Sequence, residues 1–402
     1  MTDTPAGSAS GSPADPSRLD LVLFGATGFT GGLTAEYLAR SGPTGLRWAL
    51  AGRNADKLAD VRRRLVAIDP ALADLELVVA DVTDPASLAD VARRARVVAT
   101  TVGPYRHHGE PLVAACAEAG TDYVDLTGEP EFVDTMYLAH HATAVRTGAR
   151  IVHACGFDSV PHDLGVMYTV EQLRASGPVD VRGVVRAGGA FSGGTFHSAI
   201  DAASRTRHAS RARAARRRAQ GEPAGRTSRA VSARPHRDPV LGWWLVPMPT
   251  LDADVVARSG MALESYGPQF RYAHYAGTKT LRWALGGGVG VAALGLAAQV
   301  GPLRSLLLGR VPQGEGPDEA RRARSWFTVD FVGEGDGRTI RTRVRGGDPG
   351  YRETAVMLAE SALCLALDEN PTTAGSVTTA QAMGRNLMAR LQGAGITFEV
   401  VS

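Results

Sequence analysis

The chain has 402 residues, and 44% of them are hydrophobic, which is enough to bury the cores of two or three domains. Its 44 basic and 41 acidic side chains leave a net charge of +3, which argues against a general electrostatic attraction to nucleic acid or to an anionic membrane. Three widely separated cysteines form neither a disulfide framework nor a metal-binding spacing, and they suit a reducing compartment.

Residues 1–17 are mostly Thr, Pro, Ala, Gly, Ser and Asp. Such a segment has too few apolar side chains to offset the entropy lost on ordering, so we expect a disordered tail. It also lacks the basic and apolar regions of a secretory signal, and we therefore expect a cytoplasmic protein.

Residues 18–160 alternate between short apolar runs and amphipathic stretches of helical length. This alternation is typical of parallel strands that helices cover on both faces, and it predicts a doubly wound α/β domain. The predicted strands are 21–24, 48–51, 75–80, 97–101, 123–126 and 151–154, and the predicted helices are 30–40, 55–67, 85–94, 110–119 and 130–147.

A glycine-rich segment joins the first predicted strand to the first predicted helix. Its first glycine permits a tight turn, its second lets the backbone approach a pyrophosphate, and the helix that follows offers free N–H groups and a partial positive charge. This context predicts a dinucleotide site of the Rossmann type. The candidate cofactor-binding residues in it are Gly25, Thr27, Gly28, Phe29, Thr30 and Gly31.

The end of the second strand indicates which dinucleotide binds. An acidic residue there would accept from the ribose hydroxyls of NAD, whereas a cation would bind the 2′-phosphate of NADP. The chain has Arg53 at this position and Lys57 one turn into the next helix, so we predict NADP(H). Asp81, after the third strand, either accepts from the adenine amine or caps the helix that begins near Pro85.

The fourth strand leads into a loop that we expect beside the nicotinamide. In a doubly wound sheet the ligand lies outside the carboxyl ends of the strands, so Thr101, Gly103 and Pro104 are further candidates for cofactor binding. Tyr105 and His108 are the candidate proton donors, although histidines in such loops are often only solvent-exposed. No metal site is expected.

The strict alternation ends after residue 160, and 161–402 is predicted to form an α+β substrate domain. We expect a helix at 162–173, a strand at 179–186, a hairpin of strands 325–332 and 339–344 joined across 333–337, helices at 351–367 and 380–391, and a final strand at 396–401.

Two unusual segments lie in this second half. Residues 205–218 contain seven arginines and no acid, but 42 of the 44 basic residues of the chain are arginine, and the segment lacks the aromatic residues that stack on nucleic-acid bases. We interpret it as a solvated helix, or as a docking surface for an acidic carrier protein. Residues 283–303 carry no charge but include six glycines, which favours a buried or membrane-surface hairpin over a membrane span.

Several motifs together resemble a known family. They are the glycine-rich segment at 25–31, Ala-Gly-Arg at 51–53, Thr-Val-Gly-Pro-Tyr at 101–105, Tyr-Val-Asp-Leu-Thr-Gly-Glu at 123–129, Cys-Gly-Phe-Asp-Ser-Val-Pro at 155–161, Gly-Gly-Asp-Pro-Gly-Tyr at 346–351 and Leu-Ala-Glu-Ser-Ala-Leu at 358–363. With these motifs the chain resembles the saccharopine-dehydrogenase-like oxidoreductases, and more closely the trans-acting enoyl reductases. The resemblance extends over nearly all of the chain after residue 17, and it implies that the helix at 351–367 packs back on the NADP-binding domain.

This resemblance implies an NADPH-dependent reduction of a carbon–carbon double bond in a polyketide or fatty acyl chain, for lipid or glycolipid biosynthesis. The acyl chain would be supplied by an acyl-carrier domain of a polyketide synthase, with peripheral contact to the inner face of the plasma membrane through 283–303. The alternatives are a saccharopine-type imine or carbonyl reductase and a non-catalytic NADP(H)-sensing scaffold.

Overall fold

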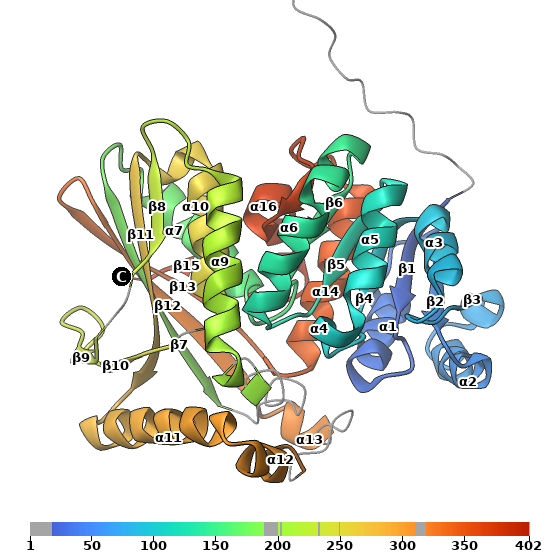
Figure 1. The fold of residues 1–402 in the computed structure, drawn as a ribbon, viewed down its shortest axis with the longest axis horizontal. Coiled ribbons are helices and arrows are strands. Elements are labelled where there is room, and N and C mark those ends of the chain that lie inside the picture. The colour runs from blue at the N-terminus through green and yellow to red at the C-terminus, as the bar shows by residue number, and fades with distance from the viewer. Residues whose placement is uncertain are drawn as a thin grey trace, which may run out of the picture.

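The computed structural model describes residues 18–188, 200–201, 203–231, 234–248, 250–309 and 319–401. Two sheets, each with its own helices, lie side by side (Figure 1). The predicted tail at 1–17 lies outside the described residues.

The first sheet has seven parallel strands in the order β14-β6-β5-β4-β1-β2-β3. This order reverses next to β1, as in doubly wound nucleotide-binding folds. The predicted strands of the first half are all present, and their ends differ from the prediction by no more than two residues. The seven strands of the sheet are β1 (Leu19–Phe24), β2 (Trp48–Gly52), β3 (Glu76–Val79), β4 (Ala95–Thr100), β5 (Asp122–Asp125), β6 (Arg150–Val152) and β14 (Gly375–Val377).

Helices cover both faces of this sheet. On one face α1 (Phe29–Ser41), α2 (Ala55–Val66) and α14 (Arg352–Leu367) share a core with β1 and β4, and on the other α3 (Pro85–Arg94), α5 (Glu110–Ala119) and α6 (Pro130–Thr147) form a second core. Because each strand is buried from both sides, its residues are apolar without alternation. This confirms the predicted fold class.

Two of these elements come from the far end of the chain. Almost every side chain of α14 is buried, as expected of a helix that is apolar all round, and the helix packs on α1, β1, β4 and β5. After it, β14 pairs in parallel with β6 through Gly375 and Arg150. The sheet that begins the chain is therefore completed by residues near its end, while the domain boundary at 160 stays a prediction.

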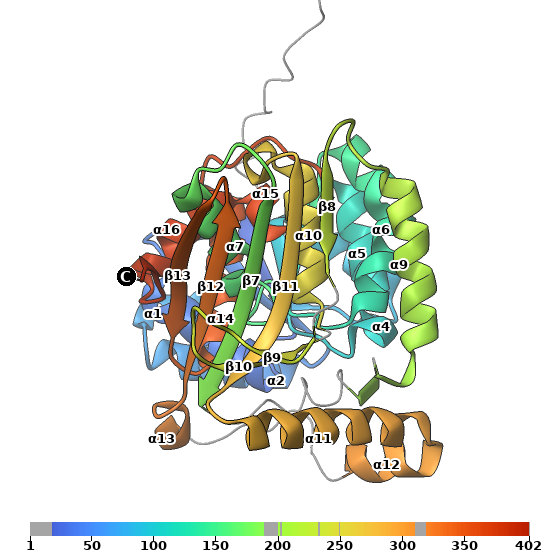
Figure 2. The ribbon, with the colours of Figure 1, turned by 90° about the vertical axis from the view of Figure 1, so that its left-hand side faces the viewer.

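The second sheet has eight strands and faces the viewer in Figure 2. Seven of them follow the order β15-β13-β12-β7-β11-β10-β9, and β8 pairs with β11. Its inner face packs on α7 (Val160–Leu173), and α10 (Asp252–Ala262) lies against β8 and β11. Its strands are β7 (Val179–Gly188), β8 (Thr227–Ala230), β9 (His236–Arg237), β10 (Trp244–Pro247), β11 (Gln269–Thr278), β12 (Trp326–Gly335), β13 (Arg338–Gly346) and β15 (Thr397–Val400).

Two details of the predicted C-terminal half were wrong. The hairpin turn is not the five residues 333–337 but Asp336-Gly337 alone, and both of these have positive φ, as a two-residue turn of type I′ requires. The helix predicted at 380–391 is split into α15 (Thr379–Ala382) and α16 (Gly384–Gly393), because Gly384 takes a positive φ that ends the first helix.

The arginine-rich segment forms α9 (Thr206–Gln220), and it is not simply solvated as the sequence suggested. Arg216 is buried and its Nε donates to Asp134 of α6 over 2.8 Å, while Arg213 forms an ion pair with Asp254 of α10. A buried cation needs such a partner. One side of α9 thus fixes it to α6, while Arg207, Arg211, Arg217 and Arg218 stay exposed.

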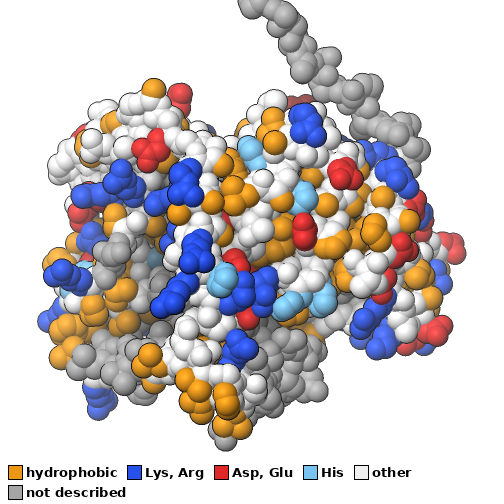
Figure 3. Space-filling view, viewed as in Figure 1, with side chains coloured by type: hydrophobic (Ala, Val, Ile, Leu, Met, Phe, Trp, Pro, Cys, Tyr) orange, Lys and Arg blue, Asp and Glu red, His pale blue; other side chains and the backbone are white. Residues whose placement is uncertain are grey.

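The apolar run at 283–303 lies in two helices, α11 (Leu281–Gln299) and α12 (Gly301–Gly309), at the edge of the molecule. In the described part, α11 packs on β10 and β11, and Leu296, Val300 and Leu306 are exposed by 71%, 48% and 53%. Among the described residues no helix is both long and apolar enough to cross a bilayer. Figure 3 shows hydrophobic side chains at the lower edge, where α11 and α12 lie.

Candidate functional site

The glycine-rich segment forms the turn between β1 and α1. Gly25 has a φ of +86°, a conformation that side chains other than glycine rarely adopt, and a Cβ there would lie 2.6 Å from Val102. At Gly31 a Cβ would lie 2.2 Å from the carbonyl oxygen of Gly25. Glycine is therefore required at both positions so that the turn can approach the helix and the neighbouring loop.

Helix α1 begins at Phe29 with its N-terminus open. Its N-cap is Gly28, no side chain caps it, and its first turn has no acidic residue. Thr27 and Gly28 are exposed, and Phe29 and Thr30 are partly exposed. Free N–H groups and the helix dipole would favour a phosphate group here, and phosphate binding at this turn stays a prediction.

The basic side chains that we predicted for the 2′-phosphate lie at the end of β2. Arg53 and Lys57 are both exposed, and Asn54 caps α2 between them by accepting from the Lys57 N–H over 2.9 Å. They are therefore free to turn toward a ligand at the carboxyl edge of the sheet. This arrangement fits the predicted role of Arg53.

Asp81 lies close to Arg53, but it does not cap the next helix. The N-cap of α3 is Asp84, while Asp81 accepts from the N–H and the hydroxyl of Thr83, each over 2.8 Å. These bonds, together with the charges of Arg53 and His108, hold the pKa of Asp81 below its ordinary value. Asp81 is thus an ionised acceptor at the same edge as Arg53.

The loop after β4 is tied to the glycine turn. The N–H of Thr101 donates to Phe24, and its hydroxyl donates to the carbonyl of Gly25 over 3.1 Å. Gly103 is exposed and Pro104 is partly exposed, so backbone at this point is open to a ligand. The structure thus brings Thr101, Gly103 and Pro104 next to the turn that would hold the pyrophosphate.

The two predicted proton donors differ in their surroundings. Tyr105 is buried, and its hydroxyl donates to the carbonyl of Thr100 and accepts from the N–H of Leu126. Burial raises its pKa well above the ordinary value. His108 is exposed and acts electrostatically on Asp81, on the side of the sheet that carries Arg53. Tyr105 holds two backbone groups in place, and His108 faces solvent.

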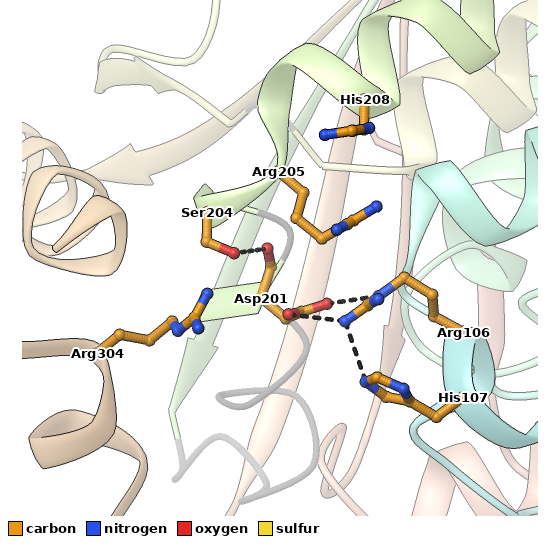
Figure 4. A pocket seen from close by; sticks show the side chains of 7 residues that line it. All are labelled: Arg106, His107, Asp201, Ser204, Arg205, His208 and Arg304. Atoms are coloured by element: carbon orange, nitrogen blue, oxygen red, sulfur yellow. Dashed lines mark hydrogen bonds and ion pairs between the residues drawn. The ribbon is translucent and has the colours of Figure 1, made fainter. Parts of the chain in front are cut away.

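A polar cavity of about 440 Å³ lies beside this loop. Arg106 comes from α4 (Tyr105–His108) and binds Asp201 through two nitrogens, over 3.0 and 3.1 Å (Figure 4). Arg205 is turned toward Glu131 of α6, with which it pairs over 2.6 Å. The cavity is lined by Arg106, His107, Asp201, Ser204, Arg205, His208 and Arg304. Its arginines and histidines outnumber its acids.

A second group of polar side chains lies where the two sheets meet, and the sequence did not single it out. His162 of α7, Asp252 of α10 and His274 of β11 are all buried. The Nε2 atoms of the histidines lie 3.8 and 3.7 Å from the two carboxylate oxygens of Asp252, which is too far for hydrogen bonds. One nitrogen or oxygen atom of each of the three side chains lies within 4.8 Å of the others, a spacing that would admit a cation.

Asp158 lies near this group, in the turn between β6 and α7. Its carboxylate is close to Gly128, which follows β5, since a Cβ on Gly128 would lie 3.3 Å from Oδ2 of Asp158. Burial raises the pKa of Asp158 to about 6, and burial together with repulsion from Asp158 raises that of Asp252. Burial lowers the pKa of both His162 and His274, and it brings the pKa of His274 to about 4.

Only one sequence signal could have pointed to these residues. Asp158 follows a strand of the alternating half, and the ligand of such a sheet lies at the carboxyl ends of its strands. Asp252 and His274 are far apart in sequence from Asp158 and from each other, so their proximity depends on how the second sheet packs.

Comparisons with known proteins agree with this description. Residues 21–152 match the family profile described as saccharopine dehydrogenase NADP binding domain. The predicted cofactor, NADP(H), is confirmed by this match. The structure is also similar to that of saccharopine dehydrogenase (L-Glu forming) from Saccharomyces cerevisiae, with a TM-score of 0.54 over 95% of this chain and 99% of that chain. At 13% identity this similarity shows the fold alone.

The similarity of sequence extends over nearly the whole chain. A trans-acting enoyl reductase of Mycobacterium tuberculosis is 38% identical over 96% of this chain and 98% of its own length. A trans-acting enoyl reductase of Mycobacterium ulcerans is 36% identical over 94% of this chain and 97% of its own length. Another M. tuberculosis protein, named provisionally for the same activity, is 40% identical over 96% of this chain and 98% of its own length.

Proposed function

The chain belongs to the family of trans-acting enoyl reductases, and from this premise we propose that it uses NADPH to reduce the carbon–carbon double bond of an enoyl thioester. The observation that carries the proposal is identity of 36–40% to family members along almost the full length of both chains. It includes the second sheet and is not confined to the nucleotide-binding half.

In this proposal the cofactor supplies the hydride, and the protein supplies its binding and orientation. The N–H groups at the start of α1 bind the pyrophosphate, and Arg53 and Lys57 bind the 2′-phosphate. The backbone at Thr101, Gly103 and Pro104 supports the nicotinamide end. Holding the two reacting carbons in contact and excluding water supplies much of the rate acceleration.

The direct test is turnover. The purified protein is mixed with NADPH and enoyl thioesters of increasing chain length, and loss of the absorbance of the reduced nicotinamide is followed together with formation of the saturated product. We expect NADPH to be consumed in equal amount to the double bonds reduced. NADPH binding without turnover of any chain length would contradict the proposal and would support a non-catalytic role.

We infer that the acyl chain arrives on an acidic carrier domain of a polyketide synthase. The support is electrostatic, because exposed arginines of α9 lie next to the arginine-lined cavity beside the loop after β4. Arginine surfaces of this kind accelerate association with acidic partners in a salt-dependent way. The word trans-acting in the names of the relatives also fits a substrate that a separate protein delivers.

This inference predicts that loss of exposed arginines on α9 raises KM only for a substrate bound to the carrier domain. Replacing Arg211 and Arg217 by glutamate should raise KM for a carrier-bound enoyl substrate at least tenfold and leave KM for the same enoyl group on coenzyme A within twofold. Arg345→Glu, an exposed arginine of β13, is the control. Equal KM values for the carrier-bound substrate in all three proteins would contradict it.

We also infer that α11 and α12 rest on a membrane surface. Leu296, Val300 and Leu306 are exposed apolar side chains on these helices and at their junction, and the same segment carries Arg282 and Arg304. This combination suits the interface of an anionic bilayer. Leu296→Glu with Leu306→Glu should reduce flotation with anionic vesicles. Val79→Glu, which changes an exposed apolar residue of β3, should not. Equal flotation of all variants would overturn the inference.

A further inference from the structure

The position of Asp158 places a carboxyl group at the nicotinamide half of the sheet. In doubly wound folds the two halves of the sheet bind the two nucleotides, and here Arg53 marks the adenosine half, at β2. Asp158 follows β6, and Gly128, against which its Oδ2 lies, follows β5. The ends of these two strands belong to the other half, which would receive the nicotinamide.

The carboxyl group of Asp158 also has no partner that would fix its charge. In the described part of the chain it makes no hydrogen bond or ion pair, and the residue as a whole is half-buried. Two other buried carboxylates nearby differ in this respect. Asp125 accepts from four donors, and Asp163 is bonded to Ser259, Thr379 and the N–H of Ala380. Those two are structural, whereas Asp158 is available.

The groups around Asp158 favour a proton on it. Asp252 of α10 repels Asp158, and His162 of α7 and His274 of β11 lie beside Asp252. No cation is among the causes that raise the pKa of either aspartate. Because burial keeps both imidazoles neutral, two carboxyl groups share a site with no positive charge. Burial raises the pKa of Asp158 to about 6, so its carboxyl group can gain and lose a proton close to neutral pH.

The alternative donors are less suited to this task. The hydroxyl of Tyr105 is held between the carbonyl of Thr100 and the N–H of Leu126, so its proton is already donated to the backbone. His108 is exposed and lies on the side of Asp81 and Arg53. Neither presents a free proton at the ends of β5 and β6.

We propose that Asp158 is the general acid of the enoyl reduction. The hydride leaves C4 of the nicotinamide and forms a C–H bond at the β-carbon, and the electrons of the double bond move to the α-carbon and the thioester oxygen. The O–H bond of Asp158 then breaks as a C–H bond forms at the α-carbon. NADPH is oxidised, the acyl chain is reduced, and the carboxylate regains its proton from water. This assignment rests on the proposed function.

Asp252 is a positioning residue in this scheme. Its carboxyl group is buried, and its Oδ1, like Nδ1 of His162, has no hydrogen-bond partner among the described residues. His274 is oriented by a 2.9 Å hydrogen bond between its Nδ1 and the hydroxyl of Tyr272. An uncharged, rigid group behind Asp158 keeps its carboxyl from being stabilised as an anion before the reaction.

The test compares Asp158→Asn, which keeps the shape but cannot donate an acidic proton, with wild type and with Asp90→Asn, which changes a half-exposed carboxylate of α3 paired with Arg93 and Arg94. We expect kcat of Asp158→Asn to fall by about 10²–10⁴-fold, the usual contribution of a general acid. The Kd for NADPH should stay within twofold, which also shows that the variant is folded. Asp90→Asn should resemble wild type.

The pH dependence of kcat supplies a second readout. Because the donor must carry a proton, wild-type kcat should fall as pH rises above about 6, approaching tenfold per unit. Asp158→Glu should keep this descending limb, and Asp158→Asn should lose it. A purely structural role would not move the pH profile.

The possible failures can be told apart. If wild type reduces no enoyl thioester, the proposed function fails. If wild type is active and Asp158→Asn keeps kcat within threefold, or if wild-type kcat is flat from pH 5 to pH 9, the assignment of Asp158 is overturned while the function stands. Stoichiometric zinc or iron in the purified protein would also overturn it, because a cation held by Asp252 would favour the ionised form of Asp158.

Discussion

Individual residues at the glycine turn have roles that the backbone geometry explains. Gly25 and Gly31 are needed because a Cβ at either position would collide with the neighbouring loop or with the turn itself. The role proposed for Arg53 depends on its charge and its place at the end of β2, and its side chain is exposed. A substitution at Gly25 or Gly31 should therefore disturb the turn, whereas a substitution at Arg53 should change cofactor binding and leave the fold intact.

Arg53→Asp should change cofactor preference without unfolding the protein. The substitution removes a charged hydrogen-bond donor worth about 1.5–3 kcal/mol and adds a carboxylate that repels the 2′-phosphate. We expect the Kd for NADPH to rise by about 10–100-fold and that for NADH to stay the same or fall. Fluorescence titration with both cofactors measures this. Arg63→Asp, an exposed position on α2, is the control, and unchanged NADPH affinity in Arg53→Asp would remove the phosphate assignment.

At the scale of elements, the nucleotide-binding sheet depends on a helix from the other end of the chain. Helix α14 lies across α1, β1, β4 and β5, and Tyr37 of α1 donates to Glu360 of α14 over 2.5 Å. This contact and the burial of Tyr37 raise the pKa of its hydroxyl. The glycine turn is therefore supported from behind by residues more than 320 positions away.

Leu358→Ala should lower the stability of the whole fold, and with it the fraction of protein that can bind NADPH. Leu358 is fully buried in α14, and a cavity of this size costs about 2–5 kcal/mol. We expect Tm to fall by several degrees in thermal unfolding, and NADPH to recover part of the loss because it binds only the folded state. Leu367→Ala, at the exposed end of the same helix, should change Tm by less than one degree. Equal effects would contradict the packing described here.

On the scale of the whole molecule, the two sheets share one core. The larger hydrophobic cluster contains Leu23 of β1, Leu363 of α14 and Phe331 of β12. Arg258 of α10 adds a polar connection, because it donates to the carbonyl and the hydroxyl of Ser376 in β14. The nucleotide-binding half and the substrate half should therefore unfold together.

This predicts that residues 18–160 do not form an independent NADPH-binding domain. The isolated segment would expose the face of the sheet that α14 covers and the edge of β6 that β14 completes. We expect it to aggregate or to bind NADPH at least 100-fold more weakly than the full chain, measured by calorimetry. Joining it through a flexible linker to residues 348–393 should restore binding. A segment 18–160 that binds like the full chain would show that the boundary at 160 separates two domains.

The sequence by itself determined the features that depend on local physics. The alternation of apolar runs specifies the strands and helices of the first half, the glycine spacing specifies the turn, and Arg53 follows its strand by one residue. Each of these can be recognised within a few residues, because strand burial, turn sterics and phosphate binding act over that range. The cofactor was predictable for the same reason.

Only the tertiary structure decided the features that depend on distant segments. It placed α14 and β14 on the first sheet, buried Arg216 against Asp134, and enclosed Tyr105 so that its hydroxyl serves the backbone. It also brought Asp158, Asp252 and His274 together, where burial raises the pKa of both aspartates and lowers that of His274. A side chain's availability for chemistry depends on which neighbours satisfy it and how far water is excluded, and those neighbours come from elements whose packing no local pattern specifies.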